Sequence, residues 1–75
     1  MELDAREMEM REVFEKLKEI MCSFSGKEVD IEILVKSYGD SRKLSTFALM
    51  SGCKTRIEKK EEYCIVRISG YACCV

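Results

Sequence analysis

The side chains best suited to covalent chemistry in this chain are its five cysteines, at positions 22, 53, 64, 73 and 74. The chain has no histidine, so it lacks the usual general base near neutral pH, the commonest metal ligand and the usual partner of a cysteine nucleophile. Much of ordinary enzyme chemistry is thereby excluded. Because the sequence holds no catalytic constellation, we expect neither an enzyme nor a bound cofactor.

The cysteines are expected to be free thiols. Their number is odd, and the amino end is acidic rather than a secretory signal, which argues against a disulfide framework. No apolar run approaches the roughly 20 residues that span a bilayer. We therefore expect a cytoplasmic protein of one small domain with no membrane partner.

Cys53 is the first candidate for a reactive thiol. Lys54 and Arg56 follow it in the sequence, and nearby cations lower the pKa of a thiol. The alternative is a buried structural cysteine, which is the commoner kind. Cys22 and Cys64 are predicted to be small core residues of this second kind.

Cys73 and Cys74 are the only close pair of thiols, and they belong to a predicted tail at residues 71–75. They could accept sulfur or electrons, or supply two ligands of a soft metal. Adjacent cysteines form a strained disulfide, however, and no Cys-x-x-Cys spacing is present for a zinc knuckle. We therefore predict no metal site. A frayed terminus with exposed thiols is the plainer interpretation of the pair.

Charge is divided unevenly along the chain. Residues 1–35 have ten acidic and five basic side chains, whereas residues 36–75 have four acidic and eight basic. Basic side chains gathered on one surface could bind an anionic protein, a phosphate or nucleic acid, although charged runs are usually solvated surface. Tyr63 and Tyr71 offer little material for base stacking, so a protein partner is favoured. The candidates for partner binding are Arg11, Arg42, Lys43, Lys54 and Arg56.

The elements that would position these groups follow from the spacing of the apolar residues. A helix is predicted from Met10 onward, because apolar side chains recur at three- and four-residue steps until Gly26 ends it. An alternation of period two predicts a strand over 29–36. A turn is predicted at 38–41, and a second helix follows it until Gly52.

Two further alternating runs, 55–59 and 63–68, flank the charged turn 60–62 and are predicted to form a hairpin. A short strand at 2–4 would complete the order strand, helix, strand, helix, strand, strand. We therefore predict an α+β fold, in which two helices cover one face of a four-stranded mixed sheet.

In this order of elements the chain resembles the TusA/SirA family of small sulfur-carrier proteins. The family opens with a strand and a motif like Leu-Asp-x-x-Gly-Leu-x-Cys-Pro-x-Pro, which aligns without a gap on residues 3–13. Residues 26–29 (Gly-Lys-Glu-Val) are similar to the start of its second strand, and residues 47–52 to its aromatic-Cys-x-x-x-Gly segment. The resemblance spans about residues 2–69 and implies a domain at 1–70.

The cysteine that carries sulfur as a persulfide in the family matches Met10 here. A helix N-terminus suits that cysteine, because its dipole and unpaired N–H groups favour a thiolate. A thioether cannot lose a proton or form a persulfide, and the matching proline positions hold Arg11 and Val13. A second family cysteine position holds Ala48. The resemblance thus implies a carrier scaffold without its sulfur site.

Two functions of different class stay open. The first is a non-catalytic protein-interaction or regulatory module, which kept the family's docking surface and binds another cytosolic protein of a sulfur-relay system. The second is a divergent sulfur or redox carrier whose working thiol is Cys53 or belongs to the Cys73-Cys74 tail. A small nucleic-acid binder is a third alternative, and a steep loss of affinity with added salt would mark it.

Overall fold

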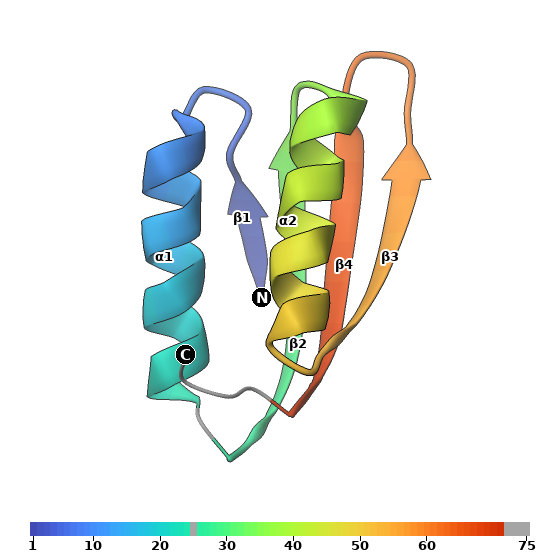
Figure 1. The fold of residues 1–75 in the computed structure, drawn as a ribbon. Helices are drawn as coiled ribbons and strands as arrows, with labels where there is room; N and C mark the ends of the chain where they lie inside the picture. The colour runs from blue at the N-terminus through green and yellow to red at the C-terminus, as the bar shows by residue number, and fades with distance from the viewer. Residues whose placement is uncertain (25, 72–75) are drawn as a thin grey trace.

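The polypeptide forms two helices and four strands in the predicted order (Figure 1). The computed structural model describes residues 1–24 and 26–71, so Cys73 and Cys74 lie outside the described residues. The predicted α+β fold with a four-stranded mixed sheet is confirmed. The strands are β1 (Glu2–Asp4), β2 (Glu28–Val35), β3 (Lys54–Lys59) and β4 (Cys64–Tyr71), and the helices are α1 (Met10–Ser23) and α2 (Tyr38–Met50).

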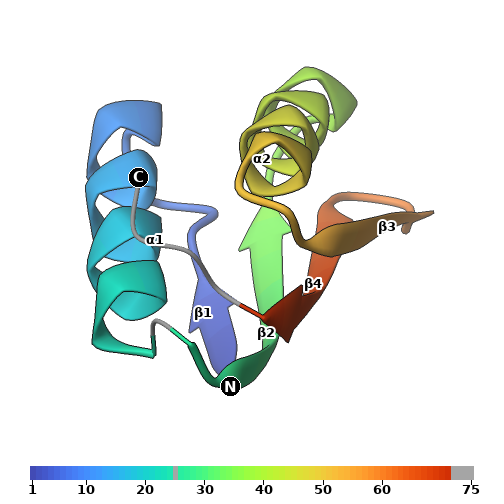
Figure 2. The same cartoon turned by 60° about the horizontal axis from the view of Figure 1, so that its bottom comes forward.

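The sheet has the strand order β1-β2-β4-β3. β1 runs parallel to β2, whereas β4 runs antiparallel to both of its neighbours, β2 and β3. Figure 2 shows both helices on the same side of this sheet, with α1 toward the β1 edge and α2 toward the β3 edge. The helices therefore cover one face of the sheet and leave the opposite face open.

The alternation in β2 sorts its side chains between these two faces. Ile31 and Ile33 are fully buried beneath the helices, whereas Glu32 between them is partly exposed on the open face. The register with β4 places Val66 beside Ile33 and Arg67 beside Glu32. One face of the sheet is therefore apolar and the other is charged.

α1 packs on the sheet through the stripe predicted for it. Val13, Leu17 and Met21 are buried, and they follow one another at the four-residue step of a single helical face. The helix ends at Ser23, and Gly26 follows with φ +80°, a left-handed conformation that glycine adopts without strain. Within the described residues, no helix is long and apolar enough to cross a membrane.

α2 begins earlier than predicted. The turn expected at 38–41 is wrong, because these residues form the first turn of the helix. Ser37 is the N-cap, and its Oγ accepts a hydrogen bond from the backbone N–H of Asp40 at 3.2 Å. Ser41 is buried and donates its hydroxyl to the carbonyl of Tyr38 at 2.6 Å. The residue types glycine, aspartate and serine indicated a turn, but capping and burial make this segment helical.

The hairpin is longer than predicted, because β4 runs to Tyr71 and so includes the first residue of the predicted tail. Gly70 has φ +126°, and a Cβ at this position would lie 3.5 Å from the Cα of Cys53. The end of β4 therefore packs closely against the connection between α2 and β3, where Cys53 lies.

Candidate protein-docking site

Met10 is the first residue of α1, at the position that the resemblance assigns to a carrier cysteine. Its side chain is partly buried and packs against the hydrophobic core. The N-cap, Glu9, makes no side-chain capping hydrogen bond, and Glu12 is the acidic residue of the first turn. The helix terminus therefore presents an apolar thioether between carboxylates, which is the opposite of a site that favours a thiolate.

Cys53 is only 4% exposed and belongs to the core on the helix side of the sheet. Its Sγ lies 3.9 Å from the carbonyl oxygen of Tyr71, to which it donates a weak hydrogen bond. Lys54 and Arg56 alternate onto the open face of the sheet, opposite Ser69 and Arg67 of β4. The thiol and the two cations proposed to activate it therefore lie on opposite sides of the sheet, and the thiol is almost entirely covered.

The two other cysteines that the structure describes differ in burial. Cys64 is buried in line with the prediction, and it is a free thiol. Cys22 is exposed near the end of α1 and is disulfide-bonded, so the expectation of a buried, free thiol at this position is wrong. The reason for its exposure is geometric, because one helical step carries the side chain about 100° away from buried Met21.

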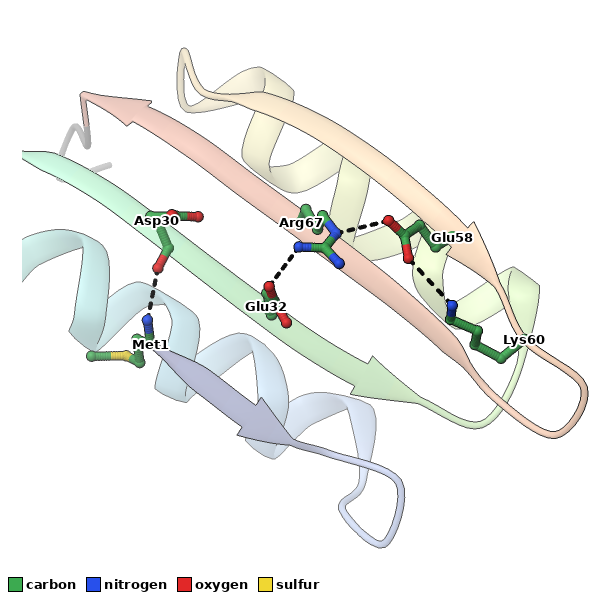
Figure 3. A network of polar contacts seen from close by, with 6 residues as sticks. All are labelled: Met1, Asp30, Glu32, Glu58, Lys60 and Arg67. Carbon is green, nitrogen blue, oxygen red and sulfur yellow. Dashed lines mark hydrogen bonds and ion pairs between the residues drawn. The ribbon is translucent and has the colours of Figure 1, made fainter.

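The open face of the sheet gathers charges of both signs. Arg67 lies at its centre, where its guanidinium donates to Glu58 at 3.0 Å and to Glu32 at 2.5 Å (Figure 3). Lys60 lies 3.6 Å from the second oxygen of Glu58. The hydrogen bond from Arg67 lowers the pKa of the Glu58 carboxyl below its usual value. The charge of Arg67 is thus compensated within the molecule.

Lys54 and Arg56 line a shallow hollow of about 390 Å³ on this same open face. Glu28 and Asp30 line the hollow as well, and so does Arg67, whose charge is paired with Glu32 and Glu58. This mixture gives the sheet face little net attraction for an anionic partner. Of the predicted partner-binding residues, these two therefore lie in the less favourable surroundings.

Arg42 and Lys43 lie on the other side of the molecule, where they line a hollow of about 430 Å³ beside the two helices. The floor of this hollow, here called the helix groove, is formed by Phe14 of α1 and Phe47 of α2. Their rings meet edge to face, with centroids 5.6 Å apart and planes at 66°. The remaining residues that line the helix groove are Thr46 and Met50.

The α1 side of the helix groove also carries cations. Arg11 precedes Phe14 by three residues and Lys18 follows it by four, and residues so spaced are neighbours on a helix surface. Both side chains are exposed, and Met10 stands one turn before Phe14 on the same flank. Arg11, predicted to bind a partner, is thereby brought to the same surface as Arg42 and Lys43.

None of these four cations is in an ion pair with a residue that the structure describes. No acidic side chain lines the helix groove either. The residues that line the helix groove are therefore apolar or basic, apart from Thr46, while on α1 Glu15 is the helical neighbour of both Arg11 and Lys18. Among residues 1–24 and 26–71, no cluster of three cysteines or carboxylates is placed to hold a metal ion.

Searches against protein-family models, curated proteins and solved structures found no match to this chain.

The sequence indicated the residues of the helix groove but not that they lie together in space. Phe14 and Phe47 belong to two helices that the apolar spacing predicts separately, and that spacing does not predict that the two rings touch. Lys18 was missed altogether. Its four-residue step from Phe14 was the available signal, because a cation at that distance flanks the ring on a helix.

Proposed function

We propose that this chain is a small cytoplasmic protein-interaction module of TusA-like type. In this proposal it binds another protein of a sulfur-relay system and regulates it, without carrying sulfur itself. The observation that weighs most is Met10 at the first turn of α1, since a sulfur carrier needs an ionisable thiol at that place.

The arrangement of elements supports the scaffold half of the proposal. The resemblance implies two helices on one face of a four-stranded mixed sheet, and the described residues have that architecture. Such a fold is shared by chains of many functions, so the functional half rests on the sites. Burial of Cys53 and the thioether of Met10 leave the described chain without an accessible, activated thiol at either place.

The surfaces support a binding role. An exposed apolar floor with a charged rim is the usual composition of a protein-docking surface. In this chain that composition is found beside the carrier position, because Met10 and Phe14 are one turn apart on α1. A partner that docks next to the former sulfur site would contact both helices.

Sulfur loading tests the proposal. The reduced protein is incubated with a cysteine desulfurase and cysteine, and each cysteine is examined by mass spectrometry of its peptide for one added sulfur atom. A carrier protein with an intact Cys-Pro-x-Pro motif serves as the positive control. We expect no added sulfur on any cysteine of this chain while the control is loaded.

The same experiment decides the alternative of a divergent carrier. Sulfur on Cys53, Cys73 or Cys74 would overturn the non-catalytic proposal and identify the working thiol. Variants Cys53→Ser and Cys73→Ser/Cys74→Ser then separate the loop thiol from the tail thiols, because only removal of the true acceptor abolishes loading.

A further inference from the structure

We propose that the helix groove binds an amphipathic helix of the partner protein, with acidic residues on both flanks of an apolar stripe. This inference rests on the proposed function and names the chemistry of the partner. It follows from the groove's floor, its rim and the kind of backbone that forms its walls.

The floor of the helix groove selects for an apolar ridge. Phe14 and Phe47 are only partly exposed, and their rings pack on each other between the two helices. Met50 at the end of α2 is 82% exposed, and it supplies a flexible thioether at the rim of the same hollow. Only a partner that projects apolar side chains into the groove can cover these three residues.

The rim selects for negative charge on both sides of that ridge. Arg42 and Lys43 stand on the α2 side, and Arg11 and Lys18 stand on the α1 side. Arg42 and Lys43, which line the hollow itself, are in no ion pair with a described residue, so a carboxylate from a partner can pair with them. On the α1 side Glu15 is the helical neighbour of both Arg11 and Lys18, so the attraction for a carboxylate is weaker there. Charge complementarity of this kind speeds association and fixes the orientation of the partner.

The walls favour a helical partner over an extended one. Both walls are helices whose backbone N–H and C=O groups bond within the helix, so they offer no ladder to an extended peptide. The free sheet edges belong to β1 and β3 at the two ends of the sheet. A helix satisfies its own backbone groups and can pack against both helices by its side chains alone.

The partly buried rings also favour a protein over a membrane or nucleic acid. Membrane association is strongest where several apolar side chains project outward from the surface, whereas Phe14 and Phe47 are only partly exposed and Met50 is the one highly exposed apolar side chain that lines the hollow. Base stacking requires an open ring face, and these two rings pack edge to face on each other. A ridge of leucine-sized side chains fits the hollow better than either.

The probe for this proposal is a synthetic stapled helical peptide with leucines at the four-residue step of one face and glutamates on both flanks. A matched peptide carries lysine in place of every glutamate, and a third has the glutamate peptide's composition in scrambled order. Binding to the full chain is measured by fluorescence anisotropy. We expect the glutamate peptide to bind at least about tenfold more tightly than either control peptide.

Two protein variants separate the helix groove from the rest of the surface. Arg42→Glu/Lys43→Glu reverses two charges at the rim of the groove and is expected to lower the affinity for the glutamate peptide about tenfold. Lys54→Glu/Arg56→Glu makes the same change of charge on the open sheet face and is expected to leave affinity within about twofold. Met50→Glu, at a highly exposed position that tolerates substitution, is expected to weaken binding as well.

Equal binding of the glutamate and lysine peptides would overturn the proposal, as would equal losses in the two charge-reversed variants. Tight binding of anionic vesicles or single-stranded DNA that Arg42→Glu/Lys43→Glu abolishes, with no peptide binding, would overturn it in favour of a membrane or nucleic acid. If the glutamate peptide does not bind and no cysteine takes up sulfur, the helix-groove proposal fails and the non-catalytic proposal stands. Sulfur uptake together with peptide binding overturns the non-catalytic proposal alone.

Discussion

Two sulfur atoms bear on the alternative that the chain carries sulfur, one in Met10 at the first turn of α1 and one in Cys53 before β3. The first is a thioether packed against the core, and it cannot ionise. The second is a thiol, but the end of β4 covers it, with Tyr71 O at 3.9 Å from its Sγ. Chemistry is thus blocked by residue type at one position and by burial at the other.

A second local feature is the ion pair between Asp4 and Arg6. The guanidinium donates to both carboxylate oxygens, at 2.9 and 2.8 Å, and it also lies 5.2 Å from the ring centroid of Tyr63. The hydrogen bonds from Arg6 lower the pKa of Asp4 from 3.8 to about 2. The pair therefore ties the end of β1 to the start of β4.

This pair makes stability depend on pH in acid. Because the pKa of Asp4 is lower in the folded chain than in the unfolded one, its stabilising effect is present above about pH 4. That effect is lost as the pH falls toward 2. In urea denaturation, the free energy of unfolding of the wild type should exceed that of Asp4→Asn at neutral pH, and this difference should disappear near pH 2. A difference that stays constant over this range would contradict the assignment.

The elements show why the start of α2 was mispredicted. Tyr38, Gly39, Asp40 and Ser41 are favoured in turns when they are judged one by one. Their helical state depends on the capping oxygen of Ser37 and on burial of Ser41 beneath the helix. The second of these is a tertiary effect, which residue types alone do not reveal.

Removal of the cap tests this explanation. Ser37→Ala deletes the oxygen that accepts the Asp40 N–H, and it should lower the free energy of unfolding by about 1 kcal/mol. Ser23→Ala, at the exposed end of α1, is the matched control and should change stability by less than about 0.5 kcal/mol. Equal effects of the two changes in urea denaturation would show that Ser37 does not hold the helix end.

Elements with a strong period were predictable for a physical reason. In α1 the buried residues Val13, Leu17 and Met21 recur at the helical step, and in β2 buried and exposed residues alternate. The buried face of each element can therefore be predicted from its own sequence. The helix groove is different. It exists because α1 and α2 lie on one face of the sheet close enough for Phe14 to meet Phe47, and that placement follows from sheet topology.

At the scale of the whole molecule, the two faces differ in how their charges are balanced. The open sheet face pairs Arg67 with Glu32 and Glu58 and mixes Lys54 and Arg56 with carboxylates. On the helix face, Arg42 and Lys43 line an apolar hollow and are in no ion pair with a described residue. The net charge of −1 does not reveal this difference.

The claim on which these proposals depend is that the chain works through its helix face by binding. Its most direct test is a titration of the isotope-labelled protein with the glutamate peptide, followed by backbone amide chemical shifts in NMR spectra. We predict that the largest shifts arise from Phe14, Arg42, Lys43 and Phe47, with the amides of β3 nearly unmoved. The claim would be contradicted if the largest shifts arose from β3 and β4. It would also be contradicted if no amide shifted even at a peptide concentration high enough to saturate a weak complex.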